Sequence, residues 1–71
     1  MNSLNPEKLH HSKWTAVRPQ HKEKHFLVTA VERDEQEQVV AVVLEAVYTG
    51  RETSLPWAAL KDDATWLMGW R

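Results

Sequence analysis

The segment from Gln38 to Tyr48, QVVAVVLEAVY, is the longest apolar run in the chain and contains five valines. Valine has a stiff branched side chain that suits a pleated surface better than a helix, so this segment predicts a central β-strand. Read with a period of two residues, both faces of the strand are apolar. We therefore expect it to be covered on both sides, to lie in a curled barrel, or to present one face to a second protomer.

The length of the chain limits the size of its core. Its 71 residues make one small domain, residues 1–71, in the size range where proteins often add disulfides, metals or a partner. Cysteine is absent, which excludes disulfides and thiolate metal sites. Four tryptophans can each bury a large apolar area. Core positions are favoured more strongly for Trp57 and Trp66 than for Trp14 and Trp70.

The amino-terminal residues carry no pattern for export or membrane insertion. We expect residues 1–6 to be flexible, with Asn5-Pro6 as a turn signal ahead of a short helical turn over Glu7–His10. No basic segment precedes an apolar one there, and no apolar run approaches the length of a bilayer span. These features predict a cytoplasmic protein that makes no membrane contact.

Two segments before the central strand also have the composition of β-strands. Ser12–Val17 contains the β-formers Trp, Thr and Val in alternation, and we expect Pro19 to stop this strand. His25–Arg33 is the second strand, and neither of its faces is cleanly polar. Between them, Gln20–Lys24 is a polar connection in which nothing demands regular structure.

Two short connections flank the central strand and predict hairpins. Asp34–Glu37 joins the second strand to the central one, although it lacks the Asn-Gly pair that would specify the turn type. Thr49–Arg51 contains Gly50, which can take a positive φ. We expect this connection to lead into a short returning strand at Glu52–Leu55.

The carboxy-terminal part predicts short helical turns. Pro56 suits a first helical position, so we expect helix over Trp57–Lys61 and a second turn over Ala64–Met68. The predicted fold is mainly β with a minor α component. It is an antiparallel meander of about four strands that curls toward a small barrel or half-barrel, with the helical segment packed across one face or open end.

Charge is unevenly distributed along the chain. Residues 1–25 carry five Lys or Arg against two Glu, a net charge of +3, whereas the remaining residues carry a net charge of −4. The five cations are Lys8, Lys13, Arg18, Lys22 and Lys24. This separation can attract an anionic partner to one end, or let one segment dock on the other.

Two functions follow from these patterns. The first is weak binding of RNA or single-stranded DNA, in which the five cations neutralise phosphates and Trp14 stacks on a base. The second is a protein–protein interaction module or homodimer, in which the second apolar face of Gln38–Tyr48, or its edge, pairs with a partner. Both make the chain a small binding module.

The sequence gives no pattern for catalysis, a metal or a cofactor. Ser12 lies beside His11 only in sequence, which creates no nucleophile and base geometry, and Gly50 and Gly69 form no phosphate loop. The four histidines have no acidic or thiol ligand at a spacing that would complete a metal site. These histidines are His10, His11, His21 and His25. We expect a protein that is not an enzyme and binds no metal or cofactor.

Glu45 is a carboxylate inside the apolar central segment. An unpaired buried charge is costly, so this group should pair, shift its pKa or reach the rim of the sheet. We expect an ion pair at the sheet edge, with Lys13 or Arg51 as the partner.

Several short motifs together resemble a known family. They are SKWTA from Ser12, KHF from Lys24, LPW from Leu55, and Gly69-Trp70. The chain is similar to a family of small bacterial tryptophan-rich proteins of undefined function, from Asn5 to Trp70. The resemblance implies one domain, a bacterial source and the tryptophans as a common framework. It brings no activity, cofactor or catalytic residue.

Overall fold

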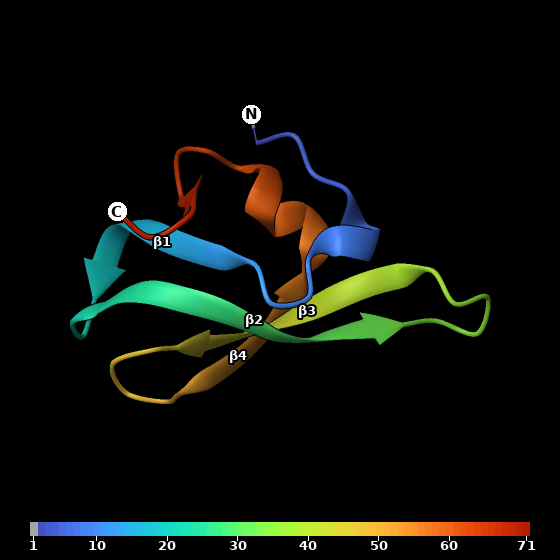
Figure 1. The fold of residues 1–71 in the computed structure, drawn as a ribbon, viewed down its shortest axis with the longest axis horizontal. Coiled ribbons are helices and arrows are strands. Elements are labelled where there is room, and N and C mark those ends of the chain that lie inside the picture. Colours follow the sequence, from blue (N-terminus) through green and yellow to red (C-terminus); the bar gives the residue numbers. More distant parts are fainter. Residues whose placement is uncertain (1) are drawn as a thin grey trace.

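The computed structural model describes residues 2–71, which form a five-stranded antiparallel sheet with two short 3-10 helices (Figure 1). In chain order the elements are η1 (Pro6–Lys8), β1 (Lys13–Gln20), β2 (Glu23–Arg33), β3 (Val39–Ala46), β4 (Glu52–Pro56), η2 (Trp57–Lys61) and β5 (Trp66–Met68). The strand order is β4-β3-β2-β1-β5, so β1 is paired with β2 on one side and with β5 on the other. The predicted mainly β antiparallel meander is confirmed.

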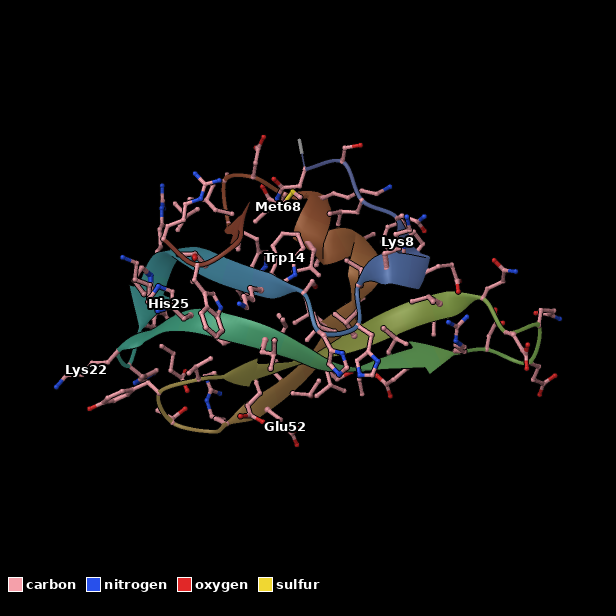
Figure 2. All side chains as sticks on the ribbon, in the orientation of Figure 1. Lys8, Trp14, Lys22, His25, Glu52 and Met68 are labelled. Carbon is pink, nitrogen blue, oxygen red and sulfur yellow. The ribbon has the colours of Figure 1, made fainter. Side chains whose placement is uncertain are left out.

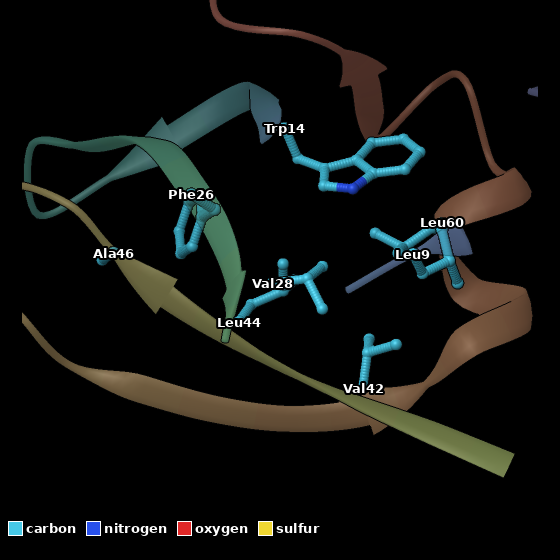
Figure 3. Close-up of a cluster of buried hydrophobic side chains, with 8 residues drawn as sticks. All are labelled: Leu9, Trp14, Phe26, Val28, Val42, Leu44, Ala46 and Leu60. Atoms are coloured by element: carbon cyan, nitrogen blue, oxygen red, sulfur yellow. The ribbon is translucent and has the colours of Figure 1, made fainter. Parts of the chain in front are cut away.

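The predicted central strand is β3, which is hydrogen bonded to β2 on one side and β4 on the other. Its alternation places Val42 and Leu44 in the core. The full set of clustered buried side chains is Leu9, Trp14, Phe26, Val28, Val42, Leu44, Ala46 and Leu60 (Figure 3). They come from three strands, from η2 and from the segment after η1, so the core lies against one face of the sheet.

The connection between β1 and β2 is a two-residue turn rather than an irregular segment. His21 and Lys22 both have positive φ, at 54° and 63°, and Gln20 pairs with Glu23 across the turn. Two successive positive φ values match the twist of the flanking strands. The prediction of a polar connection over Gln20–Lys24 was therefore wrong, because a tight turn here uses residues other than Asn and Gly.

The prediction that Pro19 stops the first strand was also wrong, since β1 continues to Gln20. The neighbouring strand β5 pairs only with Trp14 to Ala16, and the last bond to this edge is from Val17 N to Thr65 O. Beyond that bond β1 lies at the edge of the sheet, where a residue without an N–H is tolerated. Its register with β2 is also irregular between Thr15 and Gln20.

The helical prediction is confirmed for Trp57–Lys61, which is the 3-10 helix η2, and wrong for Ala64–Met68. Trp66 to Met68 instead form β5 and pair with β1, and Gly69 follows with φ of +79°. Trp66 and Trp70 fit helical spacing, but they also fit alternation. Pairing with β1 decides between the two, because it satisfies backbone groups that the edge strand would leave exposed.

The sheet is open, so the expected curl does not reach a closed barrel. β4 and β5 are its two edges, and no pairing joins them within residues 2–71. As expected, the carboxy-terminal segment packs across one face, where Leu60 of η2 is fully buried (Figure 3). Trp57 and Trp66 are partly buried against the core. Among residues 2–71, neither 3-10 helix has the length or the apolar character of a membrane span.

Residues 2–5 precede η1 and form what we call the lead-in segment, which packs beside η2. Asn2 donates from its side-chain amide to Leu60 O and Trp66 O, both at 2.8 Å. Arg33 makes a bidentate contact with Glu7, which connects η1 to the end of β2. Of the predicted flexible residues 1–6, Met1 lies outside the described residues. The flexibility of the others stays a prediction.

The core position of Leu60 gives a test of how η2 holds the fold together. We expect Leu60→Ala to reduce the free energy of unfolding by about 2–5 kcal/mol, because it deletes a fully buried side chain between η2 and the sheet. Urea unfolding followed by circular dichroism measures this change. The control is Val40→Ala, which shortens a half-exposed side chain in β3. Equal losses for the two variants would contradict a packing role for η2.

Candidate functional site

The face of the sheet opposite the core carries an apolar patch that η2 and the lead-in segment do not cover. Phe26 and Val28 point to the core, so Leu27 points to the other side. A register shift between Val28 and Ala30 then places Ala30 with Val43 on this second face. Its apolar members include Leu27, Ala30, Ala41 and Val43, all half-buried. We call this second face the open face.

One corner of the open face is covered by the chain's own carboxy-terminal residues. Trp70 donates from Nε1 to Phe26 O at 2.9 Å, and its ring lies 5.9 Å from that of His25. His25 Nε2 lies 2.8 Å from Arg71 O and donates to it. Trp70 remains 44% exposed, so this corner combines an accessible indole ring with a hydrogen-bonded imidazole.

Charge changes sign along one row of the open face. Strand register aligns Lys13 with Leu27, Leu27 with Glu45, and Glu45 with Glu52. The row therefore has a cation on β1 and two carboxylates on β3 and β4. The Nζ of Lys13 lies 4.8 Å from the centre of the Trp70 ring. This row of the open face is consequently positive at β1 and negative at β3 and β4.

The expected ion pair of Glu45 was wrong. Arg51 binds Glu23, and Lys13 is two strands away from Glu45 in the register. Glu45 instead lies directly opposite Glu52 and is half-buried, and its side chain makes no hydrogen bond or ion pair with any residue from 2 to 71. Like charges at opposed positions of a sheet are destabilising. The pair therefore favours an external cation on this side of the open face.

The six residues predicted to bind nucleic acid do not form one surface. They are Lys8, Lys13, Trp14, Arg18, Lys22 and Lys24. Figure 2 shows Lys8 and Lys22 well apart along the long axis of the molecule. Lys13 and Arg18 point to opposite faces, since Lys13 pairs with Leu27 whereas Arg18 lies beside Phe26.

Trp14 does not offer its ring to a base in this structure. It is only 1% exposed, within the core, and its Nε1 donates to Ser12 Oγ at 2.8 Å. Stacking on a nucleobase requires an accessible ring face. Trp70 is the tryptophan that meets this condition next to a lysine, and the sequence prediction did not select it.

Glu23 is a buried carboxylate that the sequence reasoning missed. Only 4% of the residue is exposed, and its carboxylate accepts hydrogen bonds from Arg51 Nε at 3.0 Å and Thr49 Oγ1 at 2.6 Å. Arg51 also binds the second oxygen. The hydrogen bonds from Arg51 and then Thr49 lower the pKa of Glu23 to about 2. The carboxylate is thus held ionised between two hairpins.

The histidines do not gather into a metal site. His10 and His11 stack with their ring centres 3.8 Å apart, and His10 Nε2 lies 3.0 Å from Thr29 O. Across residues 2–71, no group of three or more His, Cys, Asp or Glu is placed to hold a metal ion.

Comparison with known proteins adds a family match. A family model described as "Tryptophan-rich protein (DUF2389)" matches residues 12–71. This span contains all five strands, η2 and the four tryptophans. No curated protein and no solved structure matches the chain.

The buried Glu23 predicts how stability depends on pH. Its folded pKa lies below the ordinary value of 4.5, so its ionised form stabilises the fold above that pH. We expect this contribution to be lost progressively as the pH falls from about 4.5 toward about 2. Urea unfolding at about pH 7 and at about pH 3 measures it.

The matched variants are Glu23→Gln and Glu35→Gln. Glu23→Gln should be less stable than the parent chain at neutral pH and should lose less stability on acidification. Glu35→Gln removes an exposed carboxylate of the β2–β3 connection whose side chain makes no hydrogen bond or ion pair with residues 2–71, and should keep the acid dependence of the parent chain. An unchanged acid dependence in Glu23→Gln would contradict this role of Glu23.

Proposed function

The chain belongs to the tryptophan-rich protein family (DUF2389), and on that premise we propose that it is a non-catalytic interaction module that forms a homodimer through its open face. The observation that carries this proposal is the half-buried apolar patch around Leu27 and Val43, on the side of the sheet away from η2. An antiparallel sheet with one wet face normally shows polar residues there. Apolar residues in these positions favour a second layer supplied by another chain.

The dimensions of the molecule support a face-to-face contact. Its Cα trace measures 37 × 26 × 15 Å, so it is a thin body with two broad faces. A stable interface of standard size buries about 800 Å² on each partner. One broad face is large enough to provide that area, and sheets packed face to face form a core between them.

The charge row on the open face favours a second copy as the partner. A two-fold axis that lies in the interface and runs along the strands places β1 of one copy over β4 of the other. Lys13 of each copy then approaches Glu52 of its partner, near Glu45. The symmetry creates this Lys13–Glu52 contact twice. In each copy, Glu45 and Glu52 then lie near a positive charge from the partner.

The face suits this contact better than a sheet edge. Both edges of β3 are already paired, so the edge of the predicted central strand is not available. The outer strands are short, with three residues in β5 and five in β4, and β4 ends at Pro56. Short edges with proline disfavour addition of another strand.

Sedimentation equilibrium over a range of protein concentrations tests the dimer. We expect reversible association of the parent chain, and about tenfold or more weaker association of Val43→Lys, because a charge would enter the apolar centre of the interface. Tyr48→Lys is the control, since Tyr48 is 73% exposed in the β3–β4 connection. Circular dichroism checks that both variants fold. A parent chain that stays monomeric throughout would overturn the proposal.

Charge reversal tests the two-fold arrangement itself. Lys13→Glu should weaken association several-fold, because exposed ion pairs contribute about 0.2–1 kcal/mol each and the symmetry creates two. Adding Glu52→Lys should restore the association of Lys13→Glu. A double variant that associates no better than the single variant would contradict this pairing, and would require a different arrangement of the two copies.

The second candidate function is weak binding of RNA or single-stranded DNA. The observation that favours it is the corner where Lys13 lies against the accessible ring of Trp70. A cation beside an exposed indole can neutralise a phosphate while the ring stacks on a base.

Titration of the labelled protein with a short mixed-sequence RNA, followed by amide and indole NMR, tests this candidate. We expect the Trp70 indole signal to move and the shifts to fade as salt rises. Trp70→Leu should abolish the response. Trp57→Leu is the matched control, because Trp57 lies beside Lys61 on another element. Shifts that do not depend on salt, or that survive Trp70→Leu, would contradict it.

A further inference from the structure

The core side of the sheet contains a pocket of about 320 Å³ near the β1–β2 turn. Its walls come from β1, β2, the β3–β4 connection and the segment that leads into β5. Leu60 of η2 packs beside Leu9 and Trp14, whereas Phe26 lies farther from η2 (Figure 3). The helix η2 thus covers one part of this face, and the pocket lies on the other part, beside Phe26.

The floor of the pocket is apolar and aromatic. Phe26 and Trp66 meet edge to face, with ring centres 5.1 Å apart and planes at 88°. Ala16 lies on β1, between β2 with Phe26 and β5 with Trp66, and its small side chain leaves space above it. A flat apolar ring can pack against such a surface with favourable edge and face contacts.

The rim of the pocket carries two arginines, Arg18 and Arg51. Arg51 also lines the pocket, but Glu23 neutralises it. Arg18 points to the same space, because it follows Trp14 and Ala16 on the core side of β1. The Arg18 side chain makes no hydrogen bond or ion pair with any residue from 2 to 71. The pocket therefore has a net positive charge next to an aromatic floor.

We propose that this pocket binds a small aromatic carboxylate, with the carboxylate on Arg18 and the ring on Phe26 and Trp66. A guanidinium presents two parallel N–H donors that match the two oxygens of a carboxylate. The volume lies at the lower end of the range for small-molecule sites, roughly 300–1,000 Å³, and so limits the ligand to a small ring system. The pocket opens on the side of the sheet away from Leu27 and Val43, so this inference does not depend on the proposed dimer.

Titrations with indole-3-acetate and with its neutral amide test the proposal on the full chain. Amide and indole NMR spectra should show shifts of the Trp66 indole and of the amides of Ala64 and Thr65, which line the pocket. The carboxylate should bind about tenfold or more tightly than the amide, because only the carboxylate forms a charge-assisted bond with Arg18. Equal affinities, or shifts confined to other parts of the chain, would overturn the proposal.

Two matched variants separate the pocket from general attraction to positive charge. Arg18→Gln should reduce the affinity for indole-3-acetate to that for the amide. Lys24→Gln removes an exposed cation on β2 that does not line the pocket, and should leave both affinities unchanged. Carboxylate binding that survives Arg18→Gln, or that falls equally in both variants, would contradict the assignment to Arg18.

Discussion

A chain of 71 residues has enough material to cover one face of its five-stranded sheet. The core is the layer between that face and η2, with Leu60 and Trp14 fully enclosed, and the lead-in segment closes its side. Small domains bury a smaller fraction of their surface than large ones, so a single layer of side chains has to supply most of the hydrophobic stabilisation. Within residues 2–71 no comparable layer covers the second face, and the apolar residues around Val43 stay half-buried.

Polar contacts hold the end of the sheet that η2 does not reach. Burial of a carboxylate is costly unless hydrogen bonds replace the lost water, and Glu23 receives them from Arg51 and Thr49. These two residues belong to the β3–β4 connection, whereas Glu23 follows the β1–β2 turn, so the cluster ties two hairpins together. The ion pair with Glu23 also neutralises Arg51, whereas the side chain of Arg18, the other cation beside the pocket, has no ion pair within residues 2–71.

Patterns in the sequence predicted the features that depend on local chemistry. Three signals act within a few residues: the valines of β3, Gly50 and the proline before η2. The strand, the turn and the helix that they predict are all present. β5 could not be predicted in this way, because its residues fit two periodicities and the choice rests on pairing with β1. Alternation also separated the two faces of β1 correctly without indicating which face would be covered. For that reason Trp14 was selected as an accessible ring and Trp70 was not.

The two proposed binding regions, the open face and the pocket, share strand β1 but lie on opposite sides of it. Lys13 points to the open face and Arg18 points to the pocket, so one strand supplies a cation to each side of a sheet that is one layer thick. The two regions differ in kind, because a broad apolar face with opposed charges suits a protein surface, whereas a small aromatic pocket with one guanidinium suits a small anion. A ligand in the pocket would contact Trp66 of β5, and β5 continues through Gly69 into Trp70 at the corner of the open face. The chain from Trp66 to Trp70 is therefore one covalent connection between the pocket and the corner of the open face.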